Sequence, residues 1–267
     1  MGLRNKLHEA SQIQAFDLNL FANGAVLGCD FTGIVERLGK EVSKVVKGNT
    51  IAGLLWGGEV NGLGALREYT KAHKSICFRV PKNISLPEAA TVPLASLTAC
   101  LAFFSKDCLN IDRTKSDSKV LIWGGSSSVG QYVIQTAAIF GFKVLTTCSP
   151  HSFDLVKSLG ATHVFDYNDS DVVKLINDAA LGFRYVFDTI GHKTSSATAS
   201  QAIDKNGGIL TVVRPDKSFT ENVTKQTKVT PLLALTAFNR VAQYKNARFS
   251  ASSSIALMTN TDRILGK

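Results

Sequence analysis

The sequence of 267 residues contains few cysteines, and their spacing pairs none of them. The five cysteines stand at positions 29, 77, 100, 108 and 148, and no Cys-x-x-Cys pair occurs. This scatter argues against a disulfide framework and against a structural zinc lobe. It predicts a reducing compartment, and we expect the protein to be cytoplasmic.

Long apolar runs, an apolar leader and basic runs are also missing. Charged residues or glycine interrupt each apolar stretch, so we expect no membrane span, and residues 1–9 carry no h-region of a signal peptide. The net charge is +9, yet no run of five basic residues and no nucleic-acid recognition motif occurs. A solvated basic surface that attracts anionic ligands explains this charge better than nucleic-acid binding does.

The composition, with 45% hydrophobic and 19% charged residues, is that of a globular protein with one large or two smaller domains. Residues 26–85 are rich in Val, Ile, Thr and Gly, which predicts short strands separated by glycine turns, as in a small barrel or sandwich. A helical pattern follows over 86–104, and Pro87 suits its first turn.

From Lys119 the chain alternates between apolar strands and helical segments. The predicted strands are 119–123, 142–147, 162–166, 183–188 and 207–213, and the predicted helices are 128–140, 151–159, 170–180 and 194–204. This alternation predicts an α/β fold with a doubly wound parallel sheet and right-handed crossovers. The last 30 residues have no clear period, and we predict no element there.

The segment Val120–Gly130 is the most informative part of the sequence. A buried strand, a glycine-rich turn and a helix follow one another, which is the order of a dinucleotide site. The glycine frame covers Gly125, Ser126, Ser127, Ser128, Val129 and Gly130, with Ser127 where the second glycine commonly stands. The N–H groups at the helix start would face a pyrophosphate. The alternative is a Gly/Ser turn that binds nothing.

The next strand ends without the acidic residue that selects NAD by bonding the ribose hydroxyl. Ser149, His151 and Ser152 follow it, and the first acid, Asp154, belongs to the next helix. Neutral hydroxyls, a histidine and a helix start suit a 2′-phosphate, so we predict NADPH as cofactor. The alternatives are that the two serines cap the helix and that His151 is a solvated surface residue.

Several further segments carry a resemblance to a known family. They are Gly24–Val35, Gly39, Lys47–Gly53, Gly64–Tyr69, Ala89–Leu94, Leu97–Ala99, Cys148–Asp154, Lys157–Ala161, Val164–Tyr167 and Thr220–Pro231. With the glycine turn, they resemble the medium-chain dehydrogenase/reductase superfamily, and within it the zinc-independent, trans-acting enoyl reductases of fungal secondary metabolism. The resemblance implies a Rossmann-type sheet with a GroES-like β-barrel domain.

The same resemblance implies a reaction and residue roles. NADPH would reduce an α,β-unsaturated carbonyl or an acyl thioester held on a carrier protein, with a polyketide synthase as partner in trans. Thr98 would lie near the nicotinamide and Tyr167 near the cofactor phosphates; the alternatives are a helix back-bond for Thr98 and simple packing for Tyr167. Asp188 ends a strand at the ligand edge, where a structural, loop-capping role is favoured. No proton donor and no individual substrate can be named from the sequence.

A metal is not expected. Zinc alcohol dehydrogenases of the superfamily carry Gly-His-Glu where this chain has Gly28, Cys29 and Asp30, so the ligand histidine is replaced by Cys29. No His or Cys partner stands at a supporting spacing, and a small buried residue is the favoured interpretation of Cys29. Hydride addition to an alkene conjugated to a thioester needs only hydrogen-bond donors for the developing charge.

Both ends depart from the family pattern. The expected domains are a GroES-like domain over 1–85, shortened at its start, a nucleotide-binding domain over 86–238 and an atypical tail over 239–267. Phe16–Asn19 is the nearest counterpart of a family segment on the substrate side. We expect an incomplete barrel and a missing last parallel strand, with weakened catalysis. The alternatives are a diverged but complete enzyme, a quinone oxidoreductase-like enzyme, and a remnant that binds NADPH without turnover.

Overall fold

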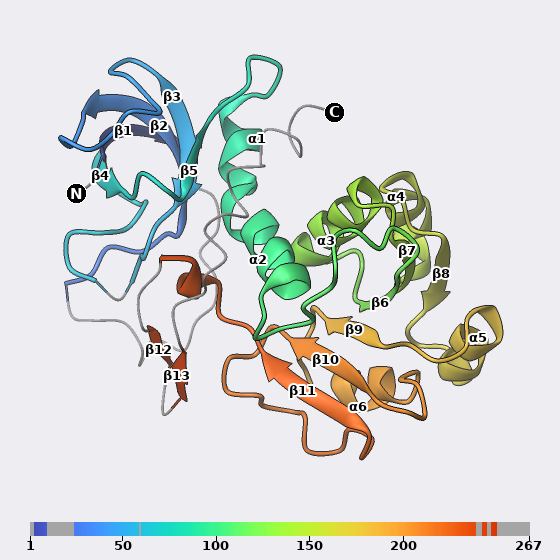
Figure 1. Ribbon diagram of the computed structural model, residues 1–267. Helices are drawn as coiled ribbons and strands as arrows, with labels where there is room; N and C mark the ends of the chain where they lie inside the picture. Colours follow the sequence, from blue (N-terminus) through green and yellow to red (C-terminus); the bar gives the residue numbers. More distant parts are fainter. Residues whose placement is uncertain (1–2, 10–23, 59, 239–241, 245–246, 250–267) are drawn as a thin grey trace. The chain divides into compact units, whose positions relative to one another are not determined.

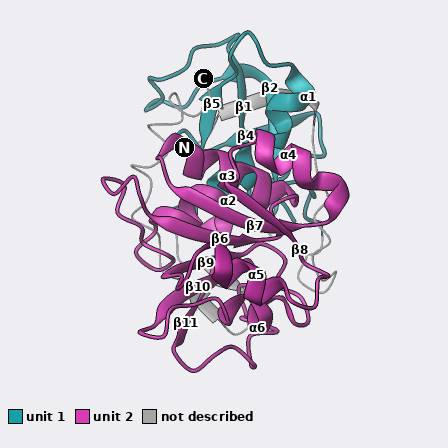
Figure 2. Ribbon diagram, turned by 90° about the vertical axis from the view of Figure 1, so that its right-hand side faces the viewer, with its two compact units in different colours: residues 1–97, 237–239, 255–267 teal, residues 98–236, 240–254 magenta. Residues whose placement is uncertain are grey.

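The computed structural model describes residues 3–9, 24–58, 60–238, 242–244 and 247–249 (Figure 1). The chain divides into two compact units (Figure 2). Unit 1 comprises residues 1–97, 237–239 and 255–267, and unit 2 comprises residues 98–236 and 240–254. The division falls within helix α2 (Pro93–Phe104), between Leu97 and Thr98.

Unit 1 contains a five-stranded antiparallel sheet in the order β4-β1-β2-β3-β5. The strands are β1 (Leu3–Glu9), β2 (Asp30–Arg37), β3 (Thr50–Leu54), β4 (Tyr69–Ala72) and β5 (Cys77–Arg79). Phe31, Val35 and Ile51 are buried in its core. The predicted short strands between glycine turns are therefore confirmed.

Strand β1 was not expected, because the sequence predicted that the start of the barrel domain is shortened. It pairs with β2 on one side and with β4 on the other, so the start of this chain does supply a strand to the sheet. The segment Phe16–Asn19 lies outside the described residues.

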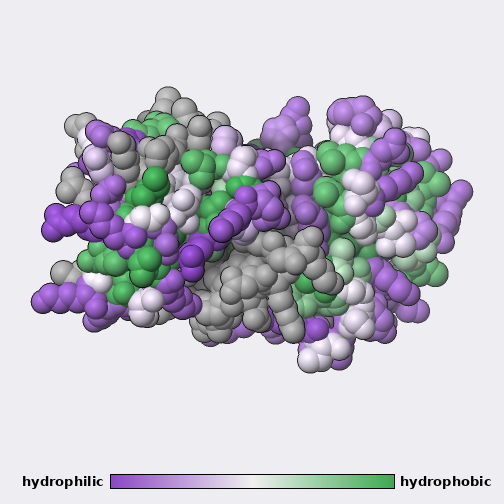
Figure 3. Space-filling model, turned by 90° about the horizontal axis from the view of Figure 1, so that it is seen from above, coloured by the Kyte–Doolittle hydropathy of each residue, from purple (hydrophilic) through white to green (hydrophobic). Residues whose placement is uncertain are grey.

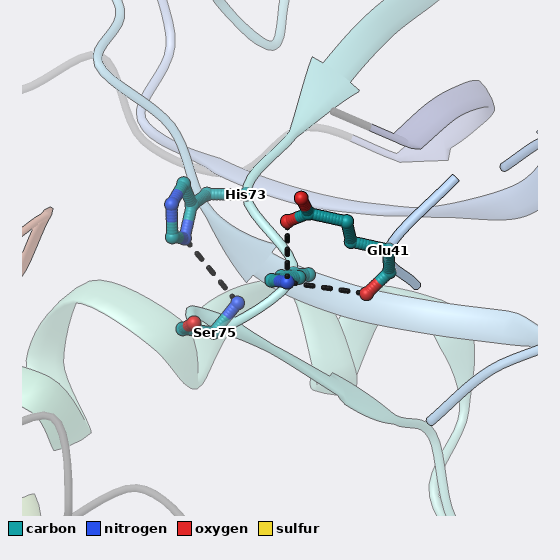
Figure 4. Close-up of polar contacts among 4 residues, drawn as sticks. Glu41, His73 and Ser75 are labelled. Carbon is teal, nitrogen blue, oxygen red and sulfur yellow. Dashed lines mark hydrogen bonds and ion pairs between the residues drawn. The ribbon is translucent and has the colours of Figure 1, made fainter. Parts of the chain in front are cut away.

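The turn between β4 and β5 is tied to the loop that follows β2 (Figure 4). The Lys74 Nζ donates to the carbonyl oxygen of Glu41 at 3.1 Å and to its Oε2 at 3.2 Å. Within the turn, the N–H of Ser75 donates to Nδ1 of His73 at 3.3 Å. The Glu41 side chain is 80% exposed, so this ion pair is held in a high-dielectric setting.

Helix α1 (Leu86–Thr91) begins with a complete capping box. The Ser85 hydroxyl accepts from the N–H of Glu88, and the Glu88 carboxylate accepts from the N–H of Ser85. Pro87 stands in the first turn, as the sequence predicted. The Ser85 hydrogen bonds also lower the pKa of the Glu88 carboxyl.

One expectation about apolar runs was wrong. The combined helical segment Leu86–Phe104 is long and apolar enough to cross a membrane by length and composition. A single charged residue, Glu88, lies near its start, where it does not break the apolar stretch. However, 78% of the most apolar 18-residue window of this segment is buried inside the structure, as in the core helix of a globular fold.

Unit 2 is built on a six-stranded parallel sheet in the order β11-β10-β9-β6-β7-β8. Its strands are β6 (Lys119–Trp123), β7 (Lys143–Cys148), β8 (His163–Asp166), β9 (Tyr185–Asp188), β10 (Gly208–Val212) and β11 (Thr227–Pro231). Its helices are α3 (Ser128–Ile139), η2 (Pro150–Ser152), α4 (Phe153–Ser158), α5 (Val172–Ala179) and α6 (Ser195–Ser200). Figure 1 shows the helices alternating with the strands, which confirms the doubly wound α/β fold.

The sixth strand corrects the prediction of a missing last parallel strand. Thr227–Pro231 forms β11 and pairs with all five residues of β10. The segment Thr-Lys-Val-Thr-Pro has weak apolar character and ends in proline, so its own pattern did not indicate a strand. Proline is tolerated because β11 lies at the edge of the sheet.

The remaining elements lie near the chain end. A 3₁₀ helix, η3 (Ala234–Phe238), follows β11, and two short strands, β12 (Ala242–Tyr244) and β13 (Ala247–Phe249), pair antiparallel. The prediction of no element in the last 30 residues was therefore wrong for this hairpin.

On the face drawn in Figure 3, hydrophilic and hydrophobic residues are intermingled.

Candidate functional site

The glycine turn joins the carboxyl end of β6 to α3, as the sequence predicted. Gly124 has φ +88°, a conformation that L side chains rarely adopt. Gly130 lies in the first turn of α3, and a Cβ there would meet the carbonyl oxygen of Gly124. The turn can therefore close only with glycine at these positions, which brings the start of α3 against the strand.

Ser127 explains the departure from the common glycine frame. It is the N-cap of α3, and its hydroxyl accepts from the N–H of Gly130 at 3.0 Å. The same hydroxyl lies 2.8 Å from the Thr189 hydroxyl. The N–H of Ser127 donates to the Gly124 carbonyl. Both polar groups of Ser127 that could face a phosphate are thus engaged inside the turn.

The free donors of the turn belong to its other residues. Among the described residues, the backbone N–H groups of Ser126, Ser128 and Val129 have no hydrogen-bond acceptor. Gly125 and Gly130 donate their N–H groups to Thr147 and Ser127. Three unpaired donors at the start of a twelve-residue helix are groups from which an anion could accept hydrogen bonds, and the helix dipole would favour its negative charge. The donor set and the glycine cradle fit a pyrophosphate.

Asp188 organises the neighbouring strand end. Its side chain is fully buried, and Oδ1 accepts from the N–H groups of Ile190 and Gly191 at 2.9 and 3.0 Å. Oδ2 accepts from the hydroxyls of Ser195 and Ser196 at 2.7 and 2.6 Å. Four hydrogen bonds fill the acceptor capacity of the carboxylate. The geometry accords with the structural, loop-capping role.

Thr189 connects this loop to the glycine turn. Its hydroxyl lies 2.9 Å from the carbonyl oxygens of both Trp123 and Gly124, and it contacts the Ser127 hydroxyl. The sequence analysis did not single out Thr189. No local pattern could have found it, because its partners stand more than 60 residues earlier in the chain.

The residues predicted for the ribose phosphate lie at two adjacent strand ends. Cys148 of β7 pairs with Asp166 of β8, so Ser149 and Tyr167 follow the paired residues at the same edge of the sheet. Tyr167 is 47% exposed. This exposure leaves the phenol group accessible and argues against the simple packing alternative for Tyr167.

His151 and Ser152 lie in the short helix η2 after Ser149. His151 is exposed and Ser152 is buried. Neither Ser149 nor Ser152 makes a side-chain capping hydrogen bond, so the capping alternative has no side-chain contact to support it. Their hydroxyls accept or donate no hydrogen bond among the described residues, and a ligand could engage them.

Asp166 is an acidic group that the sequence analysis missed at this edge. The register places it beside Cys148, and burial together with the Asp166 charge raises the pKa of the Cys148 thiol. The Asp166 Oδ1 accepts from the N–H of Asn168 at 2.9 Å and from its Nδ2 at 3.3 Å. Asp166 is brought to this edge by the pairing of β7 with β8, and the sequence alone does not give the register of that pairing.

In unit 1, Cys29 and Asp30 lie at the start of β2. Asp30 is 1% exposed, and its Oδ1 accepts from the N–H of Leu94 in α2 at 2.7 Å. Burial raises the pKa of Asp30 to about 7, although the Leu94 hydrogen bond lowers it. Cys29 is half-buried, and the described residues include no group of three His, Cys, Asp or Glu side chains that could hold a metal.

Thr98, the predicted nicotinamide-side residue, lies in the middle of α2 and is 5% exposed. Because little of the Thr98 side chain is exposed, the structure by itself does not assign it a contact with the nicotinamide, and that role stays a prediction.

Comparisons with known proteins show the family to which this chain belongs. A family profile described as the alcohol dehydrogenase GroES-like domain matches residues 8–82, and one described as zinc-binding dehydrogenase matches residues 128–244. A trans-enoyl reductase of Alternaria alternata is 33% identical over 240 residues, which cover 85% of this chain and 69% of that protein. The chain belongs to the medium-chain dehydrogenase/reductase superfamily.

Other members of the superfamily lie at a similar distance. A trans-enoyl reductase of a Fusarium species is 37% identical over 77% of this chain and 60% of its own length. A zinc-type alcohol dehydrogenase-like protein of Schizosaccharomyces pombe is 36% identical over 81% of this chain and 64% of its length. This chain therefore spans about two thirds or less of these relatives.

Solved structures of the superfamily share the fold. The CurK enoyl reductase superposes with a TM-score of 0.70 at 21% identity, over 91% of this chain and 69% of that chain. The quinone oxidoreductase of Coxiella burnetii superposes with a TM-score of 0.66 at 24% identity, over 87% of this chain and 74% of that chain. At these identities the likeness establishes the architecture alone.

Proposed function

We propose that this protein is a zinc-independent oxidoreductase that uses NADPH to reduce an α,β-unsaturated carbonyl or acyl thioester. The observation that carries the proposal is the glycine turn, where the unpaired N–H groups of Ser126, Ser128 and Val129 meet at the start of α3. Trans-enoyl reductases of two fungi are 33% and 37% identical to this chain, which supports the choice of an enoyl substrate.

Each group of residues has a separate task in this proposal. The three N–H donors hold the pyrophosphate, while Ser127 and Thr189 keep the turn closed. Ser149, His151, Ser152 and Tyr167 surround the 2′-phosphate with hydroxyls and an imidazole. When bound, NADPH would supply a hydride for the β-carbon of the alkene, and a proton would be added at the α-carbon to complete the reduction. Thr98 contributes on the nicotinamide side.

The substrate class also determines what the protein need not supply. Negative charge develops on the thioester oxygen as the alkene is reduced, and hydrogen-bond donors are enough to stabilise it. Cys29 stands where zinc-dependent relatives have a histidine ligand, and we propose that it has no metal role. A polyketide synthase that presents the thioester on a carrier protein would be the partner.

The preference for NADPH over NADH is tested by Ser149→Asp. A carboxylate at this strand end would repel the 2′-phosphate and could bond the ribose hydroxyl of NADH. We expect the affinity for NADPH to fall roughly tenfold or more, with little loss for NADH, measured by nucleotide fluorescence titration. Ser158→Asp adds the same charge at the far end of α4 and should change neither affinity. Equal losses for both cofactors in Ser149→Asp would contradict the assignment.

Asp166 makes this test informative in the wild-type protein as well. Its carboxylate lies beside the same strand end and is partly engaged by Asn168. If Asp166 served the ribose hydroxyl, the wild-type protein would bind NADH more tightly than NADPH. The proposal requires the opposite order.

Turnover separates the proposed enzyme from a remnant that only binds the cofactor. NADPH oxidation should be followed with a crotonyl thioester and with a quinone. Faster oxidation with the thioester supports the enoyl reductase, and faster oxidation with the quinone supports a quinone oxidoreductase instead. Enhanced NADPH fluorescence without turnover of either substrate would favour the remnant.

A further inference from the structure

A cavity of about 650 Å³ lies at the amino edge of the unit 2 sheet, where β9, β10 and β11 begin (Figure 1). Its charged lining residues are Arg184, Asp204 and Lys228, and Asn206 and Gln226 add amide side chains. Sites for small molecules commonly have volumes between about 300 and 1,000 Å³. The proposed cofactor site uses none of these residues, so the cavity needs an interpretation of its own.

The sheet register brings the two cationic side chains to one place. Arg184 directly precedes β9, whose Tyr185 pairs with Ile209, and Ile209 pairs in turn with Lys228. Lys228 therefore stands two strand spacings, or about 10 Å of backbone, from the start of β9. Arginine and lysine side chains are long enough to reach a ligand between these positions, and both side chains line the cavity.

Arg184 and Lys228 form no ion pair within the part of the chain that the structure describes, and both are exposed. The Cζ of Arg184 lies 5.8 Å from the centre of the Tyr185 ring, a contact that uses none of the guanidinium N–H donors. A guanidinium fork and an ammonium group without a counter-charge favour a doubly charged anion. Phosphate also matches the geometry of the fork.

The third charged residue, Asp204, limits which anions fit. Its Oδ1 accepts from the N–H of Asn206 at 2.8 Å, whereas Oδ2 accepts no hydrogen bond from the described residues. A free carboxylate oxygen repels a polyanion, but it accepts hydrogen bonds from hydroxyl groups. The amide groups of Asn206 and Gln226 can likewise pair with hydroxyls. The lining therefore suits a ligand with one phosphate group and several hydroxyl groups.

Gly182 keeps the Asp204 carboxylate open. It has φ +65°, a conformation that favours glycine, and a Cβ at this position would meet Asp204 Oδ2. The turn before β9 thus combines a backbone that requires glycine with space beside the carboxylate that a side chain would fill. Gly207 and Gly208 also line the cavity, so the backbone of the turn before β10 is open to a ligand.

The position of the cavity separates it from the cofactor site. The glycine turn and Ser149 follow the carboxyl ends of β6 and β7, whereas the cavity lies at the amino ends of β9, β10 and β11. Four residue steps, about 13 Å, separate Gly208 from Val212 along β10. Nucleotides bind open α/β sheets at the carboxyl edge, so a ligand in this cavity would be a second molecule and no part of NADPH.

We propose that the cavity binds a small phosphate monoester with free hydroxyl groups, of the kind of a sugar phosphate. Arg184 and Lys228 hold the phosphate oxygens. Asp204 accepts hydrogen bonds from the hydroxyl groups, and the amides of Asn206 and Gln226 pair with those that remain. This site goes beyond the proposed function, because no step of the reduction depends on it.

Calorimetric titration with glucose 6-phosphate, glucose and inorganic phosphate, each in the presence of saturating NADPH, tests the site. We expect glucose 6-phosphate to bind roughly tenfold or more tightly than either of the other two probes. Arg184→Ala and Lys228→Ala should each lower that affinity roughly tenfold, because each removes charge-assisted hydrogen bonds to the phosphate. Lys174→Ala removes an exposed charge from α5 and should change nothing.

Asp204→Asn distinguishes the phosphate side of the site from the hydroxyl side. The asparagine oxygen can still accept from the N–H of Asn206, so the turn should keep its shape. Loss of the negative charge should raise the affinity for inorganic phosphate. The preference for glucose 6-phosphate over phosphate should shrink, because a neutral amide oxygen is a weaker acceptor for hydroxyl groups. An equal fall in affinity for both probes would contradict the role of Asp204.

Three outcomes would overturn the inference. They are no saturable binding of glucose 6-phosphate, an unchanged affinity in Arg184→Ala, and loss of glucose 6-phosphate binding when NADPH is added. A change of sedimentation mass in Arg184→Ala or Lys228→Ala would also contradict it, because the cavity would then be a contact between copies of the chain. NADPH affinity should be equal in all these proteins. Absence of NADPH binding would reject the proposed function and leave the sugar-phosphate site standing.

Discussion

The two units each bury a carboxylate, but they surround it differently. In unit 2, Asp188 accepts four hydrogen bonds from residues that follow it within eight positions. In unit 1, Asp30 accepts one hydrogen bond, from Leu94, which stands 64 positions later. Full hydrogen bonding compensates a buried carboxylate for the water it has lost, whereas burial with a single hydrogen bond disfavours the charged form of Asp30. The pKa of Asp30 is accordingly raised to about 7.

The hydrogen bonds of Asp188 are local in the sequence, whereas the hydrogen bond of Asp30 is long-range. The loop after β9 closes on Asp188 through nearby serines, and the strand end is thereby held beside the glycine turn. Asp30 instead links β2 to α2, so its contact exists only once unit 1 has assembled. Unit 1 also contains two buried hydroxyls, of Thr32 and Thr70, that have no hydrogen-bond partner among the described residues. The buried polar groups around Asp188 in unit 2 therefore have more of their hydrogen bonds formed than those around β2 and β4 in unit 1.

The largest expected effect comes from Asp188→Ala. It would leave the N–H groups of Ile190 and Gly191 and two hydroxyls without their acceptor. Because each buried group left unpaired costs about 1–3 kcal/mol, we expect unit 2 to lose about 5 kcal/mol of unfolding free energy or more. The chain has two tryptophans, Trp56 in unit 1 and Trp123 in unit 2. Denaturant unfolding followed by Trp123 fluorescence in a Trp56→Phe background reports on unit 2.

Asp188→Asn is the matched control for this prediction. Its amide oxygen can still accept from the two N–H groups, so about half of the loss should be recovered. A loss below about 1 kcal/mol in Asp188→Ala would remove the contrast between the units.

The second effect is a pH dependence in unit 1 that Asp30→Asn should abolish. Because the folded pKa is raised from 3.8 to about 7, the native state binds the proton more tightly than the unfolded state. The stability from this group is fully present below pH 3.8 and falls as the pH rises towards and through 7. The expected loss is on the order of 4 kcal/mol relative to Asp30→Asn, whose side chain stays neutral.

This dependence can be measured by unfolding between pH 4.5 and pH 8, with Trp56 fluorescence in a Trp123→Phe background. Parallel stability curves for the two proteins would show that Asp30 titrates normally, and the proposed difference between the buried carboxylates would then fail.

The smallest effect is expected at the exposed Lys74–Glu41 pair of unit 1 (Figure 4). Glu41→Gln removes the ion pair but keeps the Glu41 backbone oxygen as an acceptor for Lys74. We expect a change of about 0.5 kcal/mol or less, which should shrink further in high salt. A salt-independent loss above about 1 kcal/mol would indicate that this surface contact matters to unit 1 as much as buried ones do.

Much of unit 2 was predictable because its signals are local. The strand, glycine turn and helix at residues 120–140 follow from apolar run length, glycine content and helical spacing, all within one short segment. Strand β11 was not predictable in this way. Its five residues have no alternating pattern, and it becomes a strand by pairing with β10 at the sheet edge.

The candidate site likewise has parts that the sequence located and parts that only the tertiary structure revealed. The sequence located the glycine turn and the residues after β7, since both follow directly from their strands. It did not reveal that Ser127 is engaged inside the turn, that Thr189 joins it, or that Asp166 lies beside Cys148. Each of these contacts depends on which strands are neighbours and in what register they pair.

By itself, then, the sequence determined the order of elements, the place of the phosphate-binding turn and the family resemblance, because steric and hydrophobic preferences act between close neighbours in the chain. The tertiary structure decided which donors of the turn are free, which buried carboxylate is fully hydrogen-bonded and which buried carboxyl has a raised pKa. Those outcomes arise from contacts between segments far apart in the sequence, where burial and strand pairing set the environment of each group.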